Sequence, residues 1–582
     1  MHSPHIIIYI RRRAWRNRAL PILALCLVSL LSMPAIAQTA NYNFEATKQL
    51  EIFNAAYYNL HLNYVDSLDA KKHVGDALNY MLSQIDPYTE YYSKENTEDL
   101  KTLSTGKYAG IGSPIVYRRD LDCAVFSDPY HDMPAYRYGV RSGDRIISVD
   151  GHVVSGEHPA DTQDYLSTIT NRLRGEPGTT VTVELRRPRI ATPDNPDTLQ
   201  SLTLSIIREQ IRRPDILLAK MLDETVGYVC LTGYTENAAD EFKNAVQSLK
   251  SQGMKSLVID LRGNGGGLLS EAVKLVGLFV KRGSEVVSIK GRNANSNYTY
   301  TTPASPLDRS MPIAVLTDYG TASAAEITSG ALQDLDRAVI VGNRTYGKGL
   351  VQSSNELPYG GAMKFTTAKY YIPSGRCVQA LDYAHRGEDG QPTHLADSLC
   401  KDFLTANGRL VRDGGGITPD VVVQLDTLPS LISYLEYSPQ LFDWAVLYHH
   451  THPTIATPET FQLSSDEMAD FKKYLEEHGF KYDDHSKALL SHVRSWAKTE
   501  GYEEDTAELF DKLEATLTHN LDHDFTRWNK EIREAAENEI ISNYYDAPGC
   551  AAYTLRNDPV LNEALAILHS PERYESILKG HK

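Results

Sequence analysis

The feature that most constrains the fold of this chain is an apolar run that leads through a tight turn into a helix-forming stretch. Residues 313–316 are all apolar, as in a buried strand, and residues 317–320 follow as a turn. Residues 324–332 are rich in helix formers. Ser323 stands between the turn and the helix, so its hydroxyl is expected at a helix N-terminus, where backbone N–H groups lack helical partners.

A second apolar run, 338–342, leads to Lys348, which follows Ser323 by 25 residues. A lysine kept neutral by burial can take the proton of a serine hydroxyl, which is the Ser-Lys form of nucleophilic catalysis. Taken singly, Ser323 could merely cap a helix and Lys348 could be a solvated surface charge. The wider pattern around the two residues decides between these interpretations.

That wider pattern resembles the carboxy-terminal processing peptidases, which are Ser-Lys endopeptidases that carry a PDZ domain. The match covers residues 320–326, then Lys348, and Gln352 four residues later. The resemblance implies that Ser323 is the nucleophile, Lys348 the general base and Gln352 the residue that orients the lysine. The family usually has serine where this chain has Thr321 and Ala325, and neither is the nucleophile position.

A glycine-rich loop supports the resemblance. Residues 257–261 read as a buried strand, and the family's Leu-Arg-x-Asn-x-Gly-Gly pattern is matched as far as Gly267. Glycines let a backbone approach a substrate closely, and acyl transfer needs N–H donors for its oxyanion. We expect these donors to be the N–H of Gly266 or Gly267 together with that of Ala324. A phosphate-binding loop is the alternative, but a Walker lysine and a Gly-x-Gly-x-x-Gly spacing are both missing.

The first 37 residues indicate the compartment. Five arginines form a basic region, residues 20–33 are largely apolar, and Ala35 and Ala37 supply a small-x-small cleavage site. The apolar stretch is short for a spanning helix, which favours a removed secretory signal over an anchor. We therefore expect a periplasmic or otherwise exported protein, cleaved after Ala37, that meets a membrane only transiently.

Removal of this segment takes away five arginines and no acidic residue, so the net charge changes from −16 to −21. Such an acidic exported protein is not expected to bind nucleic acid. Five cysteines remain, an odd number that excludes a dense disulfide scaffold. Cys377 and Cys400 flank one insertion and could pair in an oxidising compartment.

The length and the changes of texture along the chain indicate several domains. The expected division is a signal peptide (1–37), an N-terminal helical region (42–105), a PDZ domain (106–208), a serine peptidase catalytic domain (209–426) and a helical C-terminal accessory domain (427–582). In the N-terminal region apolar residues recur at three- and four-residue spacing, for example Phe53, Tyr57, Leu60 and Tyr64. This stripe could be ordinary core or a dimer face.

Residues 106–208 read as short strands and turns, and they resemble a PDZ domain of the bacterial protease type. Such a domain adds a peptide as an extra strand and binds its terminal carboxylate with backbone N–H groups. The resemblance assigns the carboxylate-binding loop to Tyr108, Ala109, Gly110, Ile111 and Gly112, with Ile111 lining the side-chain pocket. The alternative is a plain β-rich module whose glycines only make turns.

Strands and helices alternate through residues 209–426, which implies a sheet with helices packed on it. By resemblance this is the fold of Clp-type proteases and crotonases, with a polar insertion over 382–412. The chain as a whole is thus expected to be a multi-domain α/β protein. Its Clp/crotonase-like catalytic domain would carry an inserted β-rich PDZ domain, between helical N- and C-terminal regions.

In the C-terminal region, residues 465–478 and 507–541 read as helices. Several histidines lie close together in sequence and could bind a metal: His449, His450 and His452, and also His519 and His523. They lack a carboxylate or cysteine set at known ligand spacing. We therefore expect no metal and no cofactor.

The sequence predicts an exported serine endopeptidase. Its PDZ domain would capture free C-termini of proteins or peptides, and the Ser323–Lys348 dyad would cleave them through an acyl-enzyme. Lys348 must then be largely neutral, with a pKa well below that of free lysine because of burial. A homodimer and an adaptor-regulated enzyme both fit. Two other functions remain open, a catalytically inert peptide-binding scaffold and a crotonase-like enzyme for acyl thioesters.

Overall fold

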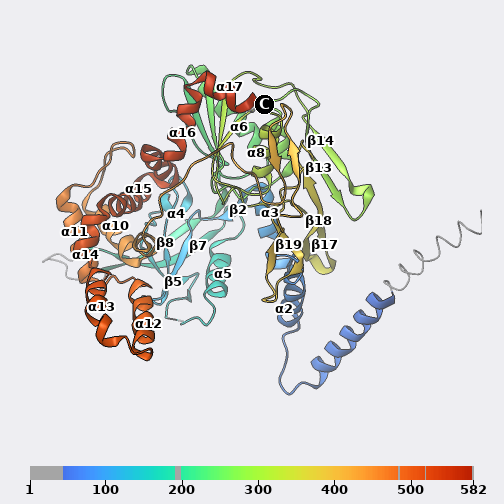
Figure 1. The fold of residues 1–582 in the computed structure, drawn as a ribbon. Helices are drawn as coiled ribbons and strands as arrows, with labels where there is room; N and C mark the ends of the chain where they lie inside the picture. The colour runs from blue at the N-terminus through green and yellow to red at the C-terminus, as the bar shows by residue number, and fades with distance from the viewer. Residues whose placement is uncertain (1–43, 157, 191–197, 483–484, 518–519, 580–582) are drawn as a thin grey trace, which may run out of the picture. The chain divides into compact units, whose positions relative to one another are not determined.

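The computed structural model describes residues 44–579 except 157, 191–197, 483–484 and 518–519 (Figure 1). The predicted signal peptide therefore lies outside the described residues. The chain divides into two units, residues 1–84 and 85–582, which we describe separately. Across the described helices, none combines the length and the apolar character needed to cross a bilayer.

The smaller unit contains two helices. The chain is helical over 44–63 and again in α2 (Ala70–Ser83). Asp69 begins α2, because its carboxylate accepts the N–H of Lys72 and so satisfies one of the free donors of the first turn. Much of the predicted apolar stripe is exposed within this unit, including Phe53, Leu60 and Tyr64.

The larger unit is built around a six-stranded sheet in the order β10-β11-β12-β15-β16-β23. All neighbouring strands are parallel except β10, which runs antiparallel to β11. The bounds are β10 (Ile216–Met221), β11 (Val226–Leu231), β12 (Ser256–Asp260), β15 (Ile313–Thr317), β16 (Val339–Gly342) and β23 (Val421–Val422). The strand–helix alternation predicted for this region is confirmed.

Helices cover both faces of this sheet. They are α6 (Ala238–Ser251), α7 (Leu269–Val276) and α8 (Ala324–Asp334) on one face, and α16 (Pro559–Leu568) and α17 (Pro571–Lys579) on the other. Successive residues of β12 point to opposite cores, since Leu257 and Ile259 join the first and Val258 the second. Burial on both faces explains why the strands read as continuous apolar runs. The helices that cover the second face, α16 and α17, lie far along the chain from the strands of this sheet.

A second, antiparallel sheet has the order β1-β18-β13-β14, with β17 paired to the other side of β18. Its strands are β1 (Glu90–Tyr92), β13 (Glu285–Gly291), β14 (Tyr298–Thr301), β17 (Leu350–Glu356) and β18 (Ala362–Tyr371). The region expected to be helical over 42–105 therefore contains a strand, β1, which α3 (Thr97–Thr105) follows. Pairing with β18 overrides the local helical pattern there.

The β-rich domain contains the sheet β3-β4-β5-β7-β8, with β6 paired to β5. The elements are β3 (Ile115–Arg118), β4 (Cys123–Phe126), α4 (Pro134–Arg137), β5 (Arg145–Val149), β6 (His152–Val153), α5 (Thr162–Leu173), β7 (Thr180–Pro188) and β8 (Leu199–Ile207). β3 is an edge strand, and α5 packs beside it on the same core. β2 (Lys107–Gly110) and β9 (Glu209–Arg212) pair with each other, where the chain enters and leaves this domain.

Five helices share the C-terminal core, namely α9 (Ser430–Glu436), α10 (Pro439–Thr451), α11 (Ser465–Glu477), α14 (Leu521–Arg527) and α15 (Asn529–Thr554). α12 (His485–Thr499) and α13 (Glu503–Leu517) form a hairpin joined to them (Figure 1). The single helical stretch expected over 507–541 is wrong, because it consists of α13, α14 and the start of α15. One break has a clear cause, since the Asn520 side chain accepts the N–H of Asp522 and starts a new helix.

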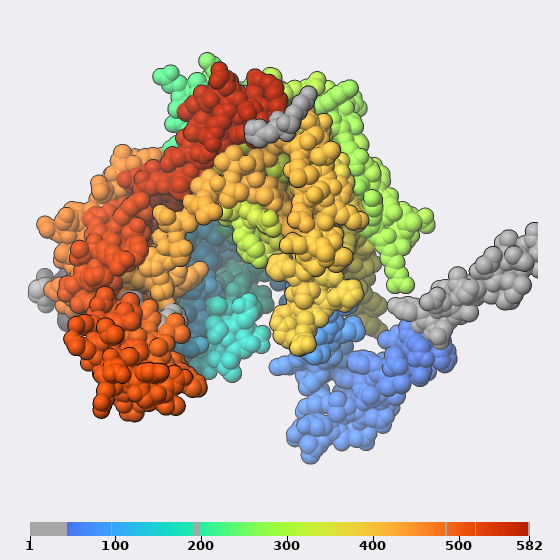
Figure 2. Space-filling model, in the orientation of Figure 1, coloured from blue at the N-terminus to red at the C-terminus, as the bar shows by residue number. Residues whose placement is uncertain are grey.

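The insertion after β18 forms two short hairpins at the surface (yellow in Figure 2). They are β19 (Leu381–Arg386) with β20 (Pro392–His394), and β21 (Asp402–Leu404) with β22 (Leu410–Arg412). The pairing considered for Cys377 and Cys400 is absent, since both are free thiols in the described chain.

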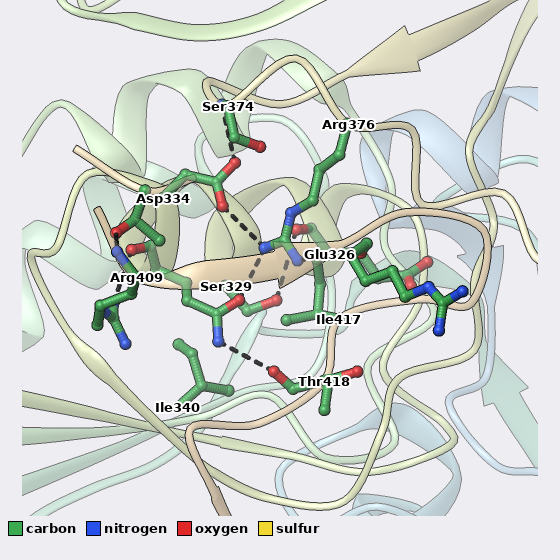
Figure 3. A network of polar contacts seen from close by, with 12 residues as sticks. Glu326, Ser329, Asp334, Ile340, Ser374, Arg376, Arg409, Ile417 and Thr418 are labelled. Carbon is green, nitrogen blue, oxygen red and sulfur yellow. Dashed lines mark hydrogen bonds and ion pairs between the residues drawn. The ribbon is translucent and has the colours of Figure 1, made fainter. Parts of the chain in front are cut away.

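A buried polar network fixes the C-terminal end of α8 to the loops around it (Figure 3). Arg376, 1% exposed, donates to Asp334 Oδ1 at 2.8 Å and to Gln333 Oε1 at 2.7 Å. Asp334 also accepts the N–H of Ser374 at 3.0 Å. Arg409 donates to Asp336 and Asp420 nearby. A buried ion pair tolerates the loss of one partner poorly, because the other charge is left uncompensated.

We therefore expect Arg376→Met to lower the free energy of unfolding by about 3–5 kcal/mol. Urea unfolding followed by far-UV circular dichroism measures this. The matched control is Arg412→Met, whose ion pair with Asp402 at 3.8 Å is half exposed, with an expected cost below about 1 kcal/mol. Equal losses for the two variants would contradict the assignment of the buried pair as an anchor.

Candidate active site

Ser323 lies where the structure bends sharply between β15 and α8. Its backbone has φ 54° and ψ −115°, a conformation that a residue other than glycine rarely adopts. The turn before it is held by Thr321, whose hydroxyl donates to the Leu261 carbonyl at 2.8 Å. The strand–turn–serine–helix order predicted from the sequence is confirmed. Such strain is typical of residues whose position is fixed for function.

The glycine-rich loop packs directly on this bend. A Cβ on Gly266 would lie 2.7 Å from Ser323 Cβ and 2.8 Å from the backbone nitrogen of Ala324. Only glycine fits there, because real side chains never come so close. Asn264 holds the loop from within, donating to the Leu231 carbonyl at 2.7 Å and accepting the N–H of Gly266 at 2.9 Å.

This contact bears on the predicted oxyanion donors. The N–H of Gly266 is engaged by Asn264, whereas in the described chain the N–H groups of Gly267 and Ala324 have no hydrogen-bond partner. Of the two glycines considered from the sequence, Gly267 is thus the one with a free donor. The role itself stays a prediction.

The carboxylate of Glu326 joins the two segments that carry Ser323 and Lys348. It accepts the N–H of Ser323 at 2.9 Å and the N–H of Lys348 at 2.8 Å. It also accepts the N–H of Gly347 at 2.7 Å and the hydroxyl of Thr345 at 2.6 Å. The side chain is fully buried, and burial raises the pKa of Glu326 against the opposing effect of these donors.

The side chain of Lys348 is half-buried. Burial lowers the pKa of Lys348, as predicted, and the charge of Lys364 lowers it further. Its Nζ lies 4.1 Å from the centre of the Tyr88 ring. Within the described chain, Lys348 Nζ forms no hydrogen bond with Ser323 Oγ. The structure thus brings both predicted dyad residues to one edge of the sheet, with the amine resting on an aromatic face.

Gln352 lies on β17, where the pairing with β18 shifts register. Its Nε2 donates to Thr366 Oγ1 at 3.3 Å, so its predicted role as orienter of Lys348 stays a prediction. Gln352 also lines a cavity of about 640 Å³. The walls include Leu269 and Ser270, which follow the glycine loop, and Val351 of β17. A cavity of this size, with Gln352 in its wall, can take part of an extended peptide.

The predicted carboxylate-binding loop joins β2 to the β-rich domain. Tyr108, Ala109 and Gly110 pair with β9, while Ile111 is buried in the core of the domain. The Ile111 carbonyl accepts the N–H of Ala135 at 2.7 Å, and Gly112 has φ 75°. Ile111 is thus a core residue of this domain, and carboxylate binding by the loop stays a prediction.

Arg262, the arginine of the glycine-rich loop, has a clear structural position. It pairs with Asp260 at the end of β12 and with Asp558 at the start of α16, both at 2.6 Å. It therefore links the glycine loop to the helices behind the sheet.

The histidines considered as metal ligands lie apart from this site. His449 and His450 are in α10 and His452 caps it, while His519 falls outside the described residues. In the described part of the chain, no three His, Cys, Asp or Glu side chains are grouped so that they could hold a metal ion.

Comparison with known proteins decides the family. Three family models match, "Peptidase family S41" over 225–383, "PDZ domain" over 125–187 and "Probable PDZ-protease, C-terminal helical domain" over 431–568. The carboxy-terminal-processing protease of Bartonella bacilliformis is 32% identical over 356 residues, which are 60% of this chain and 77% of that protein. The chain belongs to the carboxy-terminal-processing proteases of family S41.

Other similar proteins include carboxy-terminal processing protease CtpA of Bacillus subtilis, 30% identical over 56% of this chain and 66% of that protein. Among solved structures, a photosystem II D1 C-terminal processing protease is 26% identical, covers 65% of this chain and 88% of its own, and has a TM-score of 0.35.

As an S41 carboxy-terminal-processing protease, the protein is a serine peptidase with a PDZ domain and a helical C-terminal domain. The predicted family, enzyme class and fold class are confirmed. Two features of the site were not predicted from the sequence: the contact of the Tyr88 ring with Lys348, and the hydrogen bonds by which Glu326 joins the Ser323 and Lys348 segments. Two sequence signals pointed to Glu326, its place in the family motif and its capping-box spacing three residues after Ser323.

We expect Glu326→Gln to lower kcat by about 100-fold with KM nearly unchanged, because a displacement of the reacting groups by about 1 Å costs that much. A glutamine has one acceptor oxygen, so donors on the Ser323 and Lys348 segments would lose their partner. Steady-state kinetics on a fluorogenic peptide measures both constants. The control is Glu285→Gln, an exposed glutamate on β13. Wild-type kcat in a folded Glu326→Gln protein would contradict the bridging role.

Proposed function

We propose that this S41 peptidase is an exported endopeptidase in which Ser323 and Lys348 form the catalytic dyad. The observation that carries the proposal is the shared anchor: one buried carboxylate, that of Glu326, binds the backbone N–H of both residues. Two further observations support it, the strained backbone of Ser323 and the lowered pKa of Lys348. A base near neutral pH needs such a pKa, because only the neutral amine accepts a proton.

The proposed reaction proceeds in two halves. Lys348 takes the proton of the Ser323 hydroxyl as the oxygen attacks the substrate carbonyl carbon. The N–H groups of Gly267 and Ala324 stabilise the oxyanion, and the new Lys348 ammonium protonates the departing amine as the C–N bond breaks. Lys348 then takes a proton from a water that attacks the ester carbonyl carbon. Its ammonium returns a proton to Ser323 Oγ as the C–Oγ bond breaks, which releases the acid and restores both residues. Gln352, on the strand that follows Lys348, would orient the amine.

The PDZ domain is proposed to capture free C-termini of protein substrates. Its edge strand β3, with α5 beside it, offers the arrangement in which a peptide adds as a further strand. The loop that runs from Tyr108 to Gly112 precedes this strand and would meet the carboxylate. Export follows from the predicted signal peptide, and the substrates would then be exported or membrane-released proteins. Protein substrates need no metal or cofactor in this chemistry.

The test is mass spectrometry of the products from an unfolded protein with an apolar C-terminal tail. We expect fragments from the mature enzyme and none from Ser323→Ala. Amidation of the tail removes charge-assisted hydrogen bonds of about 1.5–3 kcal/mol, so cleavage should fall roughly 10- to 100-fold. Fragments from Ser323→Ala would refute the role of Ser323 as nucleophile. An unchanged cleavage rate after amidation of the tail would refute capture of the C-terminal carboxylate.

The lowered pKa of Lys348 gives a pH dependence with a defined sign. As pH rises through this pKa the amine becomes neutral, so kcat/KM should rise with pH and reach half its plateau below 10.5, the value of an exposed lysine. The pH profile of kcat/KM measures the midpoint. Lys348→Arg, which stays charged, should remove activity across the range. A midpoint at or above 10.5 would contradict Lys348 as the base.

A further inference from the structure

Two tyrosines from distant parts of the chain meet next to Lys348, the proposed base. The Nζ of Lys348 lies 4.1 Å from the ring centre of Tyr88, which precedes β1. The hydroxyl of Tyr88 lies 3.3 Å from that of Tyr383, and the two rings meet edge to face with centres 6.0 Å apart. Tyr383 is on β19, in the insertion whose purpose the family pattern leaves open.

Tyr88 is itself firmly anchored. Its N–H donates to Asp86 Oδ1 at 2.9 Å, and the Asp86 side chain is buried. The next residue, Thr89, accepts the N–H of Thr366 at 3.3 Å, and Thr366 in turn accepts the amide of Gln352. β1 then pairs with β18. The segment that carries Tyr88 is thus fastened to the same sheet that carries Gln352.

The ring affects Lys348 in two opposite ways. Its bulk keeps water from the amine, which favours the neutral form. Its face is electron-rich and attracts the ammonium, which favours the charged form and holds it in place. Lys348 alternates between the neutral amine and the ammonium during catalysis, and contact with the ring would hold its Nζ in the same position in both forms.

We propose that Tyr88 is a positioning residue for Lys348, and that Tyr383 of the insertion fixes the ring of Tyr88 in place. The proposal rests on the function proposed above, in which Lys348 is the base. It assigns the insertion a direct connection to the active site. It also gives a role to the pairing of β1 with β18, which holds the segment of Tyr88 on the antiparallel sheet that contains Gln352.

The test separates bulk from ring face by three substitutions at one position. Tyr88→Leu keeps apolar bulk without the ring face, so the pKa of Lys348 should fall by about 0.5–1.5 units. Tyr88→Ala admits water, so the pKa should rise toward that of an exposed lysine. Tyr88→Phe keeps the ring and should leave the pKa unchanged. The charges that act on Lys348, those of Lys364, Asp86, Glu326 and Glu90, are the same in all three variants.

The readout is the labelling of Lys348 by trace acetic anhydride as a function of pH, quantified by mass spectrometry. This measures the titration of the amine without requiring proteolysis. The pH profile of kcat/KM is recorded in parallel, and melting curves check folding. The matched control is Tyr359→Leu, since Tyr359 is 99% exposed. It should change neither measurement.

Tyr383 is tested by a double-mutant cycle. Tyr88→Phe and Tyr383→Phe each remove the contact between the two hydroxyls, and Tyr88→Phe also removes the contact of Tyr88 with Tyr346. Each variant should therefore lower kcat several-fold, and the double variant should lose no more than Tyr88→Phe alone. Independent, additive losses would refute the link to the insertion.

Opposite pKa shifts in Tyr88→Leu and Tyr88→Ala would support the proposal. Shifts of the same sign, or none, would overturn it. If the two variants show these shifts but the wild-type protein cleaves no substrate, the contact between Tyr88 and Lys348 is supported while the proposed function fails. If the wild-type protein cleaves substrate but the pKa of Lys348 is the same in all Tyr88 variants, only the positioning role of Tyr88 fails.

Discussion

The arrangement of the candidate active site depends on one buried carboxylate. Parallel strands β15 and β16 bring the segments of Ser323 and Lys348 to the same edge of the sheet, but neighbouring strands fix only their spacing of about 4.8 Å. The orientation of the two segments comes from Glu326, which accepts hydrogen bonds from both. A buried carboxylate is costly unless its donors are in place, so the four donors and the acceptor stabilise one arrangement together. That arrangement also holds Ser323 in a backbone conformation that costs about 1–3 kcal/mol.

The helix that carries Glu326 is fixed at both ends by polar contacts. Every residue of α8 is buried, so its position cannot be set by one apolar face turned inward. Glu326 binds the loop of Lys348 at the first turn, and Asp334 pairs with Arg376 at the last. We infer that these two contacts set the position of the helix along its axis. The glycine loop then needs only to pack against the first turn, where a side chain on Gly266 would clash with Ser323.

Much of the catalytic region was predictable because its signals are local. The strands β11, β12, β15 and β16 read as short apolar runs, and the turn before Ser323 is encoded in adjacent residues. The predictions failed where a contact from elsewhere overrode the local pattern. β1 is a strand because β18 pairs with it, and the stretch expected as one helix over 507–541 breaks where Asn520 caps a new helix.

The sequence by itself determined the family, the strand–turn–serine–helix unit and the places of Ser323, Lys348 and Gln352, because all of these are written in short runs of residues. Only the tertiary structure decided which groups surround them. Tyr88 and Tyr383 are 295 residues apart and meet beside Lys348, and α16 returns from the C-terminus to cover the sheet. Such contacts follow from chain closure and from the burial of whole faces, which no local propensity encodes. The free donor of Gly267 has the same origin, because it depends on which neighbour Asn264 binds.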